Sequence, residues 1–244
     1  MKKVIEVKNL NFSYPDGNFK LENLNFEVFK NESIAIIGPN GSGKTTLILN
    51  LVGILKGEGE IKIFDVLLKK ENLKFIRKKI QVVFQNPDDQ LFSPTVFDDI
   101  SFGPLNLGLN KDEVIRKVDY ALKVVGMEKY KYHFPQHLSF GQKKKVSIAT
   151  VLSIEPEVII FDEPTIGLDP KSRKNIIEII KNLKGTKIIA SHDLDMIYYL
   201  CDRVILMNSG KIIKIGDKEE VLKDEELLSN NDLEIPLSLF YSKF

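Results

Sequence analysis

The chain has 244 residues, enough for one large core or for two unequal lobes. Hydrophobic residues make up 43% and charged residues 28%, which is ordinary for a soluble globular protein. The formal net charge is +1, so no global field exists that would hold nucleic acid, and we expect no nucleic-acid partner. The basic run from Lys69 to Lys79 is predicted to be a solvated surface.

Cysteine content and hydropathy help to predict the cellular location of the protein. The single cysteine, Cys201, excludes an internal disulfide and fits a reducing environment. Its apolar neighbours predict a small buried side chain rather than a reactive thiol. No stretch approaches the ~18 apolar residues that span a bilayer, and Met1-Lys2-Lys3 does not begin a signal peptide. We therefore expect a cytosolic protein that reaches a membrane only through a partner.

The N-terminal part is predicted to be rich in strands. Residues Val4 to Tyr14 and Phe19 to Phe29 flank the turn Pro15-Asp16-Gly17 and predict a hairpin. A short apolar run without alternation, Ser33 to Ile37, is typical of a strand buried on both faces. Apolar residues at helical spacing follow between 47 and 55, and further strands are predicted at Glu60 to Phe64 and Ile80 to Phe84.

The remainder begins with a helical region, from 86 to 154. Two N-terminal caps, Thr95-x-x-Asp98 and Asn110-x-x-Glu113, introduce it, and an apolar stripe after the second ends at Gly126. Buried strands return at 158–161 and 187–190, and a late hairpin turns at Asn208-Ser209-Gly210. The predicted core is thus α/β with parallel strands and a helical insertion.

A phosphate-binding loop follows the first buried strand. The pattern G-x-x-x-x-G-K-[ST] occurs between a predicted strand and a predicted helix, the context that the motif requires. Its glycines let backbone N–H groups point at phosphate oxygens, Lys44 neutralises the β- and γ-phosphates, and Thr45 offers a hydroxyl to Mg²⁺. The nucleotide-binding residues predicted here are Gly38, Pro39, Asn40, Gly41, Ser42, Gly43, Lys44, Thr45 and Thr46.

Two carboxylates end the strand Val158 to Phe161. Adjacent acids repel each other and desolvate poorly, so Asp162 and Glu163 are unusual for a purely structural strand. Beside Mg²⁺ they are sensible, because Asp162 supports the metal while Glu163 orients and deprotonates the attacking water.

Three further candidates are ambiguous when taken singly. Gln85 follows a strand end and could contact both water and Mg²⁺, but a surface glutamine is the ordinary interpretation. His192 follows the strand 187–190, where open parallel sheets bind ligands, and is a candidate γ-phosphate sensor or a solvent-facing histidine. Tyr14 could stack on adenine, although a tyrosine near a turn is commonplace.

A second glycine-bearing segment is Leu138-Ser139-Phe140-Gly141-Gln142. Ser139 is predicted to be a helix N-cap, and Gln142 three residues later completes a capping box. Such a helix start aims free N–H groups at an anion, but Ser-x-x-Gln by itself favours an ordinary helix start.

Taken in order, these segments resemble the nucleotide-binding subunit of ABC transporters over nearly the whole chain. The family's adenine-stacking aromatic, Walker A loop, Q-loop and signature motif match Tyr14, 38–45, Gln85 and 138–142. Its Walker B strand, D-loop and switch histidine match 158–163, Gly167-Leu168-Asp169 and His192. The resemblance implies nucleotide contacts from Ser139, Gly141, Gln142 and Asp169, and ATP and Mg²⁺ as cofactors, with Thr45, Gln85 and Asp162 at the metal.

The resemblance also implies a fold. We expect a P-loop NTPase (RecA-like) α/β core with a parallel sheet, an N-terminal antiparallel β subdomain and an inserted helical subdomain. The corresponding ranges are 1–85 and 155–220 for the core, 86–154 for the helical subdomain and 221–244 for a short C-terminal extension.

A narrower likeness is to the energy-coupling factor (ECF) and cobalt-type importer ATPases. It is carried by Phe12-Ser13-Tyr14-Pro15, by the run Val83 to Phe92, by Val96-Phe97-Asp98-Asp99 and Phe102-Gly103-Pro104, and by the tail Leu233 to Leu237. The likeness implies uptake of a vitamin or a transition-metal ion, with a transmembrane coupling protein and a membrane substrate-binding component as partners. It also implies a peripheral location on the cytoplasmic face of the membrane.

Two positions depart from the family pattern. Phe140 replaces the usual signature glycine, and Gly167 replaces the more frequent D-loop alanine. A bulky residue would be strained at 140 only if that position needed φ > 0, and Gly141 remains to supply such freedom. We expect Phe140 to point away from nucleotide.

The family likeness implies a head-to-tail dimer, homo- or heteromeric, with two ATP sites. Lys44, Thr45, Asp162 and Glu163 of one subunit would act with the signature of the other, and Gln85 would couple ATP to the membrane partner. Two alternatives remain. One is the ATPase of another ABC transporter class; the other is a soluble ABC ATPase of DNA repair or translation, disfavoured because the chain has one cassette and no sustained heptads.

Overall fold

The computed structural model of the protein describes residues 2–17 and 19–241. Contacts between Cα atoms divide the chain into two compact units, which are described separately. Unit 1 comprises 1–80 and 184–244, and unit 2 comprises 81–183. The division predicted at residues 86 and 154 stays a prediction.

Unit 1 contains two sheets. The first has the strand order β2-β1-β4-β5 and is antiparallel throughout; its strands are β1 (Lys3–Ser13), β2 (Lys20–Phe29), β4 (Glu58–Ile63) and β5 (Val66–Leu67). The second contains, in order, β10 (Lys211–Asp217), β9 (Arg203–Asn208), β3 (Ser33–Ile37) and β8 (Thr186–Ala190). Strand β3 pairs in parallel with both β8 and β9, while β9 and β10 form an antiparallel hairpin. The predicted parallel core, N-terminal hairpin and late hairpin are therefore confirmed.

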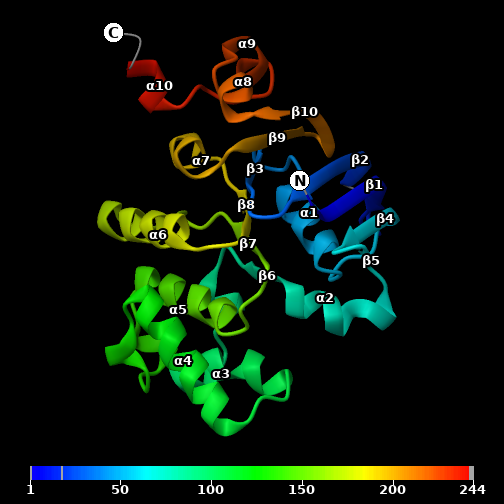
Figure 1. The fold of residues 1–244 in the computed structure, drawn as a ribbon. Helices are drawn as coiled ribbons and strands as arrows, with labels where there is room; N and C mark the ends of the chain where they lie inside the picture. The colour runs from blue at the N-terminus through cyan, green and yellow to red at the C-terminus, as the bar shows by residue number, and fades with distance from the viewer. Residues whose placement is uncertain (1, 18, 242–244) are drawn as a thin grey trace. The chain divides into compact units, whose positions relative to one another are not determined.

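The helices of unit 1 are mostly short. They are α1 (Lys44–Leu51), α2 (Leu73–Lys79), α7 (Leu194–Leu200), α8 (Lys218–Leu222), α9 (Glu225–Ser229) and α10 (Leu237–Tyr241), with a 3₁₀ turn η1 (Lys70–Asn72). In Figure 1, α8 and α9 lie beside the β9–β10 hairpin. Helix α2 falls within the basic run, where the sequence predicted only a solvated surface.

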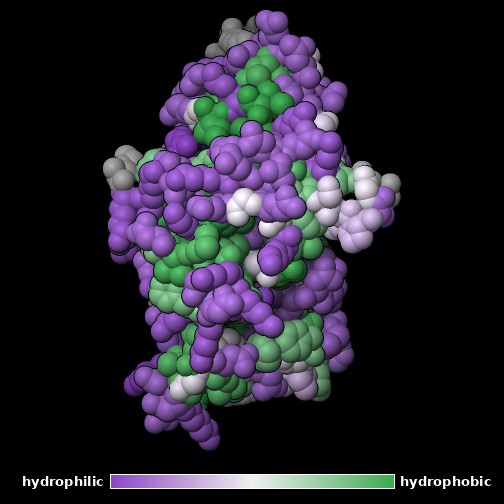
Figure 2. Space-filling model, turned by 90° about the vertical axis from the view of Figure 1, so that its right-hand side faces the viewer, coloured by the Kyte–Doolittle hydropathy of each residue, from purple (hydrophilic) through white to green (hydrophobic). Residues whose placement is uncertain are grey.

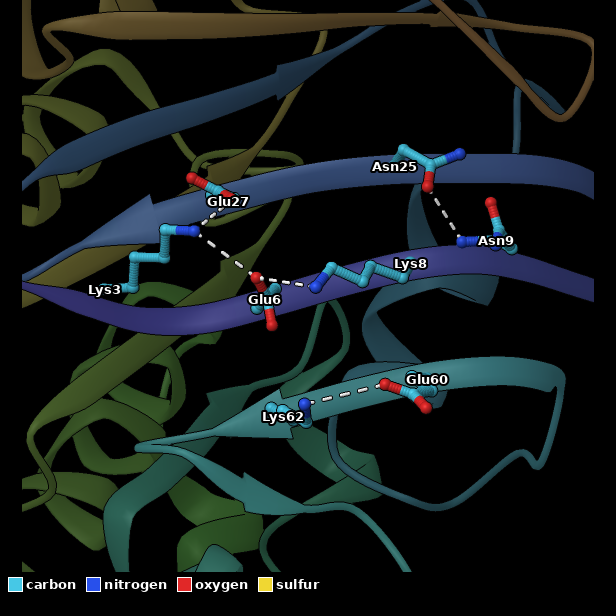
Figure 3. Close-up of polar contacts among 8 residues, drawn as sticks. All are labelled: Lys3, Glu6, Lys8, Asn9, Asn25, Glu27, Glu60 and Lys62. Atoms are coloured by element: carbon cyan, nitrogen blue, oxygen red, sulfur yellow. Dashed lines mark hydrogen bonds and ion pairs between the residues drawn. The ribbon is translucent and has the colours of Figure 1, made fainter.

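Charged and amide side chains form ion pairs and hydrogen bonds on the antiparallel sheet (Figure 3). The Lys3 ammonium contacts both Glu6 of its own strand and Glu27 of β2, across one antiparallel pair. Further along, the pairing register shifts at Asn9, whose φ is 49° and whose N–H donates to Asn25 Oδ1 at 2.9 Å. Asparagine tolerates this left-handed bulge conformation better than most residues.

Unit 2 combines two neighbouring strands with helices. The strands are β6 (Ile80–Val83) and β7 (Val158–Asp162), and the helices are α3 (Val96–Asn106), α4 (Lys111–Val125), α5 (Phe140–Leu152) and α6 (Pro170–Asn182). Three 3₁₀ turns connect them: η2 (Pro87–Asp89), η3 (Glu128–Tyr130) and η4 (Pro135–His137). Helices α3, α4 and α5 pack against one another in a group (Figure 1).

The predicted helix boundaries of unit 2 are confirmed. Thr95 caps α3, since its hydroxyl accepts from the Asp98 N–H, and Asn110 caps α4 with a full capping box. Gly126 ends α4 in the left-handed conformation, with φ 66°. The helix ends could be predicted from the sequence because each depends on residues only a few positions apart.

Each unit has fully buried strands. All five residues of β3, of β7 and of β8 are buried, as unalternating apolar runs predict. Cys201 is also buried, as predicted, with 1% of its surface exposed. The face drawn in Figure 2 is largely hydrophilic, with separate hydrophobic areas. Among the described residues, no helix is both long and apolar enough to cross a membrane.

Candidate nucleotide site

The phosphate loop connects β3 to α1 within unit 1. Gly38, Gly41 and Gly43 have φ of 151°, 79° and 104°, values that side chains disfavour. A β-carbon on Gly38 would lie 2.1 Å from the Met207 carbonyl oxygen and 2.7 Å from Ser42 Oγ, so glycine is required there. Among the described residues no side chain caps α1, and an uncapped helix start is a suitable place for an anion.

Lys44 and Ser42 are the buried polar groups of this loop. The Lys44 ammonium lies inside the loop and donates to the carbonyls of Gly38 at 2.8 Å and Pro39 at 3.1 Å. Ser42 is 1% exposed, and its hydroxyl oxygen has no hydrogen-bond partner among the described residues. A buried hydroxyl is expected to find a partner, and a phosphate oxygen would provide one, so the loop fits a nucleotide.

Tyr14 and His192, both predicted site residues, lie in the same unit as this loop. The Tyr14 hydroxyl is 3.4 Å from Thr46 Oγ1 of α1, and its ring packs edge-on against Phe12. His192 is exposed two residues beyond β8. Because Ile36 of β3 pairs with Ala190 of β8 in parallel, the loop and His192 both follow the carboxyl ends of neighbouring strands.

Unit 2 carries the two Walker B carboxylates. Asp162 is the last residue of β7 and is 2% exposed, and Glu163 is 6% exposed. The backbone of Glu163 is left-handed, with φ 42°. A residue with a long side chain rarely adopts this conformation, which costs roughly 1–2 kcal/mol. Such strain often occurs at functional sites, and nothing in the sequence predicted it.

The signature segment begins helix α5 as predicted. Ser139 Oγ accepts from the Gln142 N–H at 3.4 Å, and Gln142 Oε1 accepts from the Ser139 N–H at 2.9 Å, which completes the capping box. Ser139 and Phe140, at the start of the helix, are exposed.

Phe140 and Gly141 of the signature segment both lie in the first turn of α5. Phe140 is the first residue of α5 and does not have positive φ, so the bulky side chain causes no strain there. Gly141 also lacks positive φ, and the backbone freedom expected of it is not used. Its role is close packing instead, because a β-carbon on Gly141 would lie 2.7 Å from Ser172 Oγ.

Asp169 of the D-loop is the N-cap of α6. Its Oδ1 accepts from the N–H groups of Lys171 and Ser172, each at 3.0 Å. Hydrogen bonds from Ser172, followed by one from Lys171, lower the pKa of Asp169. The carboxylate is thus engaged locally, and its contact with nucleotide stays a prediction.

Gln85 is exposed just beyond β6, and its backbone is held by a residue that sequence reasoning missed. Lys144 of α5 is completely buried, and its ammonium donates to the carbonyls of Phe84 at 2.9 Å and Gln85 at 2.6 Å. Lys144 is the middle one of three consecutive lysines, Lys143 to Lys145, and no prediction was made for it from the sequence. Lys144 nevertheless shares the helical spacing of the buried Ile148 and Val151, and this signal could have identified it.

Comparison with known proteins decides the family. The sequence matches the ABC transporter family over residues 21–166. The chain belongs to this family. As predicted, it is an ATP-hydrolysing subunit of an ABC transporter, with the P-loop α/β fold of its relatives.

Its relatives include ECF transporter ATPases, which confirms the narrower likeness. The chain is 48% identical to the energy-coupling factor transporter ATP-binding protein EcfA of Methanocaldococcus jannaschii, covering 96% of this chain and 86% of that protein. Identity to EcfA of Methanothermobacter thermautotrophicus is 46%, covering 96% and 77%. The chain is thus an ATPase subunit of an ECF-type importer.

Two solved structures share the fold. CbiO1 from Clostridium perfringens, part of the ABC transporter complex CbiONQ, is 39% identical and covers 100% of both chains with a TM-score of 0.83. A dimeric ATP-binding cassette in a post-hydrolysis state, bound to ADP and Pi, is 28% identical with a TM-score of 0.78. It covers 88% of this chain and 98% of that one.

Proposed function

We propose that this ATPase binds MgATP with the residues that the sequence singles out, and drives uptake of a vitamin or a transition-metal ion. The observation that supports this best is the phosphate loop of unit 1. Its left-handed glycines, the uncapped start of α1 and the buried Lys44 form a cradle for an anion. Lys44 would neutralise the β- and γ-phosphates, and Tyr14 beside Thr46 would stack on adenine.

The proposed metal ligands have the chemistry that Mg²⁺ prefers. Thr45 offers a hydroxyl, Gln85 an amide oxygen and Asp162 a carboxylate, all hard oxygen donors. Mg²⁺ would neutralise charge on the transferred phosphoryl group. Glu163 would accept the proton of the attacking water, and His192 would contact the γ-phosphate.

The signature segment is proposed to act on the nucleotide of a second subunit. Ser139 is exposed at the start of α5, so its hydroxyl is accessible to a partner. Two ATPs would then be enclosed in a head-to-tail dimer of identical or homologous subunits, with Gly141, Gln142 and Asp169 near the bound phosphates. Hydrogen bonds to the γ-phosphate that strengthen in the transition state would accelerate hydrolysis.

An exposed aromatic pair is the proposed contact with the transmembrane coupling protein. Phe92 is 65% exposed and Phe102 is 51% exposed, and their rings pack edge to face with centroids 5.2 Å apart. Leu105 follows one turn later on α3 and is 56% exposed. Exposed apolar patches of this kind mark protein interaction sites. The chain would thereby sit peripherally on the cytoplasmic face of the membrane.

The test is reconstitution with a coupling protein and a membrane substrate-binding component in lipid vesicles. We expect ATP-dependent uptake of a labelled vitamin or transition-metal ion, abolished by Glu163→Gln. Phe92→Ala combined with Phe102→Ala is expected to release the chain from the coupling protein in detergent pull-downs while ATP binding persists. Vesicles that hydrolyse ATP but accumulate neither class of substrate would contradict the transport proposal.

A further inference from the structure

Lys144 is the most deeply buried charged side chain among the described residues of unit 2. It lies on α5 five residues beyond Ser139 and has no exposed surface. Its ammonium reaches the carbonyl oxygens of Phe84 and Gln85, at 2.9 and 2.6 Å. One side chain therefore joins the signature helix to the backbone of the residue proposed to sense Mg²⁺ and water.

Burying an ammonium group costs free energy unless hydrogen bonds or an opposite charge compensate for the lost hydration. Lysine is almost never fully buried without a partner. Burial lowers the pKa of Lys144 to about 8, although the nearby carboxylates of Asp162 and Glu163 oppose this shift. The two carbonyl oxygens of the Gln85 segment are the hydrogen-bond partners that offset the cost of this burial.

Other contacts join the same two segments. Lys143 of α5 pairs with Asp88 at 2.7 Å. Gln90 donates to the Ser147 carbonyl at 2.8 Å and to Thr150 Oγ1 at 2.6 Å. Its Oε1 accepts from the Phe84 N–H at 3.2 Å. Residues 84–90 are thus attached to α5 at three places.

Among these ties, only the one from Lys144 holds Gln85 itself. The Lys143 pair is half in solvent, since the Asp88 side chain is 57% exposed, and exposed ion pairs contribute little. Gln90 fixes the far end of the segment. Removal of the Lys144 ammonium would leave two carbonyls without their donor and would free the backbone at Gln85.

We propose that Lys144 is a positioning residue that locks the Gln85 segment to the signature helix, so that the two segments move as one body. This rests on the proposed function, in which Gln85 serves one ATP and the signature serves another. A displacement of Gln85 by the membrane partner would then also move the signature segment. A displacement of the signature segment would likewise move Gln85.

The test compares Lys144→Met, which keeps the length of the side chain but removes its donors, with the native full-length protein. Lys123→Met is the matched control, because Lys123 is an exposed lysine on α4 of the same unit. Three quantities are measured: the Kd of a fluorescent ATP analogue, kcat and KM for ATP hydrolysis, and amide hydrogen exchange across 84–91.

For Lys144→Met we expect Kd and KM to stay within about twofold while kcat falls at least about tenfold, because misplacing a group near the reaction costs rate rather than binding. Exchange across 84–91 should accelerate about tenfold while α3 and α4 keep native exchange. Lys144→Arg, which retains donors, should recover most of the turnover, and Lys123→Met should match the native protein throughout.

Native kcat with native exchange across 84–91 in Lys144→Met would overturn the inference, as would accelerated exchange throughout α3, α4 and α5. If Lys144→Met does not fold, Lys144→Gln, whose amide can donate to one carbonyl, should show intermediate kcat, and native kcat would again overturn the inference. A native protein that does not hydrolyse ATP would instead refute the proposed function, while the exchange measurement would still test the tie.

Discussion

The ring of Phe140 lies over the backbone of Gly167. A β-carbon on Gly167 would come within 3.3 Å of Phe140 Cε1 and 3.7 Å of Cζ. Both residues depart from the usual pattern of the family, one by gaining a ring in the signature and the other by losing a methyl group in the D-loop. The two departures are therefore complementary, since the missing methyl group provides the space that the ring occupies.

This complementarity predicts coupling between the two positions. Gly167→Ala should destabilise the native protein for two reasons: φ is 73° at this position, and the new methyl group would crowd the ring. With Phe140→Ala only the first reason remains, and the cost should be about 1 kcal/mol. We expect the native background to add about 0.5 kcal/mol or more, the usual size of a contact coupling.

Urea unfolding of the four proteins in this double-mutant cycle measures the coupling. The control pair combines Phe140→Ala with Gly126→Ala, since Gly126 has a similar φ of 66° and its β-carbon would meet open space. That pair should be additive. Equal costs of Gly167→Ala in both backgrounds would show that the ring and the D-loop are independent.

Helices α4 and α5 both begin with a capping box. The contribution of Ser139 to stability can therefore be separated from its proposed contact with nucleotide. Asn110 and Ser139 both cap helices of unit 2 with the same pair of hydrogen bonds. Alanine at either position should cost about 1 kcal/mol of stability. Only Ser139→Ala is expected also to reduce turnover per folded molecule, because only Ser139 is proposed to contact ATP.

Thermal unfolding and ATP hydrolysis, both normalised to folded protein, check this pair. If Ser139→Ala loses stability but keeps native turnover, the segment is an ordinary helix start. If Asn110→Ala reduces turnover equally, the loss follows from the weakened helical unit rather than from a contact with nucleotide.

The sequence predicted features that depend on neighbours along the chain. The capping box at Ser139, the left-handed C-cap at Gly126 and the buried strand before Gly38 each follow from residues a few positions apart. The order of these motifs along the chain then indicated the family. The contacts that the sequence did not predict join distant segments.

Lys144 and Gly141 illustrate this limit. The helical spacing of Lys144 with buried residues could have indicated its burial, but not its acceptors, because these are backbone carbonyls about sixty residues away. Gly141 was expected to supply backbone freedom, whereas the structure uses its small size against Ser172. The left-handed backbone of Glu163 likewise depends on how β7 meets the following turn, and no single residue type predicts it.

Cys201 should be chemically inert in the folded protein. It is 1% exposed, and burial raises the pKa of its thiol well above the usual range, with Asp202 adding to the shift. Because the thiolate is the reactive form, modification by a thiol reagent should be negligible at pH 8 and stoichiometric in denaturant. Rapid labelling of the native protein would contradict this burial.

Glu163→Gln should separate ATP binding from hydrolysis. The amide keeps the shape of the side chain but cannot accept a proton from water, so turnover should fall by roughly 10²–10⁴ while ATP affinity is retained. Equilibrium binding of a fluorescent ATP analogue and a phosphate-release assay measure the two quantities. Near-normal phosphate release would remove Glu163 from the role of general base.

Ser139→Arg should prevent dimer closure without affecting ATP binding to the single subunit. Ser139 is exposed at the start of α5, so a long side chain fits without disturbing the core, and it projects from the surface that is proposed to meet the partner's nucleotide. We expect the variant, combined with Glu163→Gln to prevent hydrolysis, to remain monomeric with ATP, whereas Glu163→Gln alone dimerises. Size-exclusion chromatography with light scattering distinguishes the two states. ATP-dependent dimers of the double variant would show that the signature segment does not lie in the dimer interface.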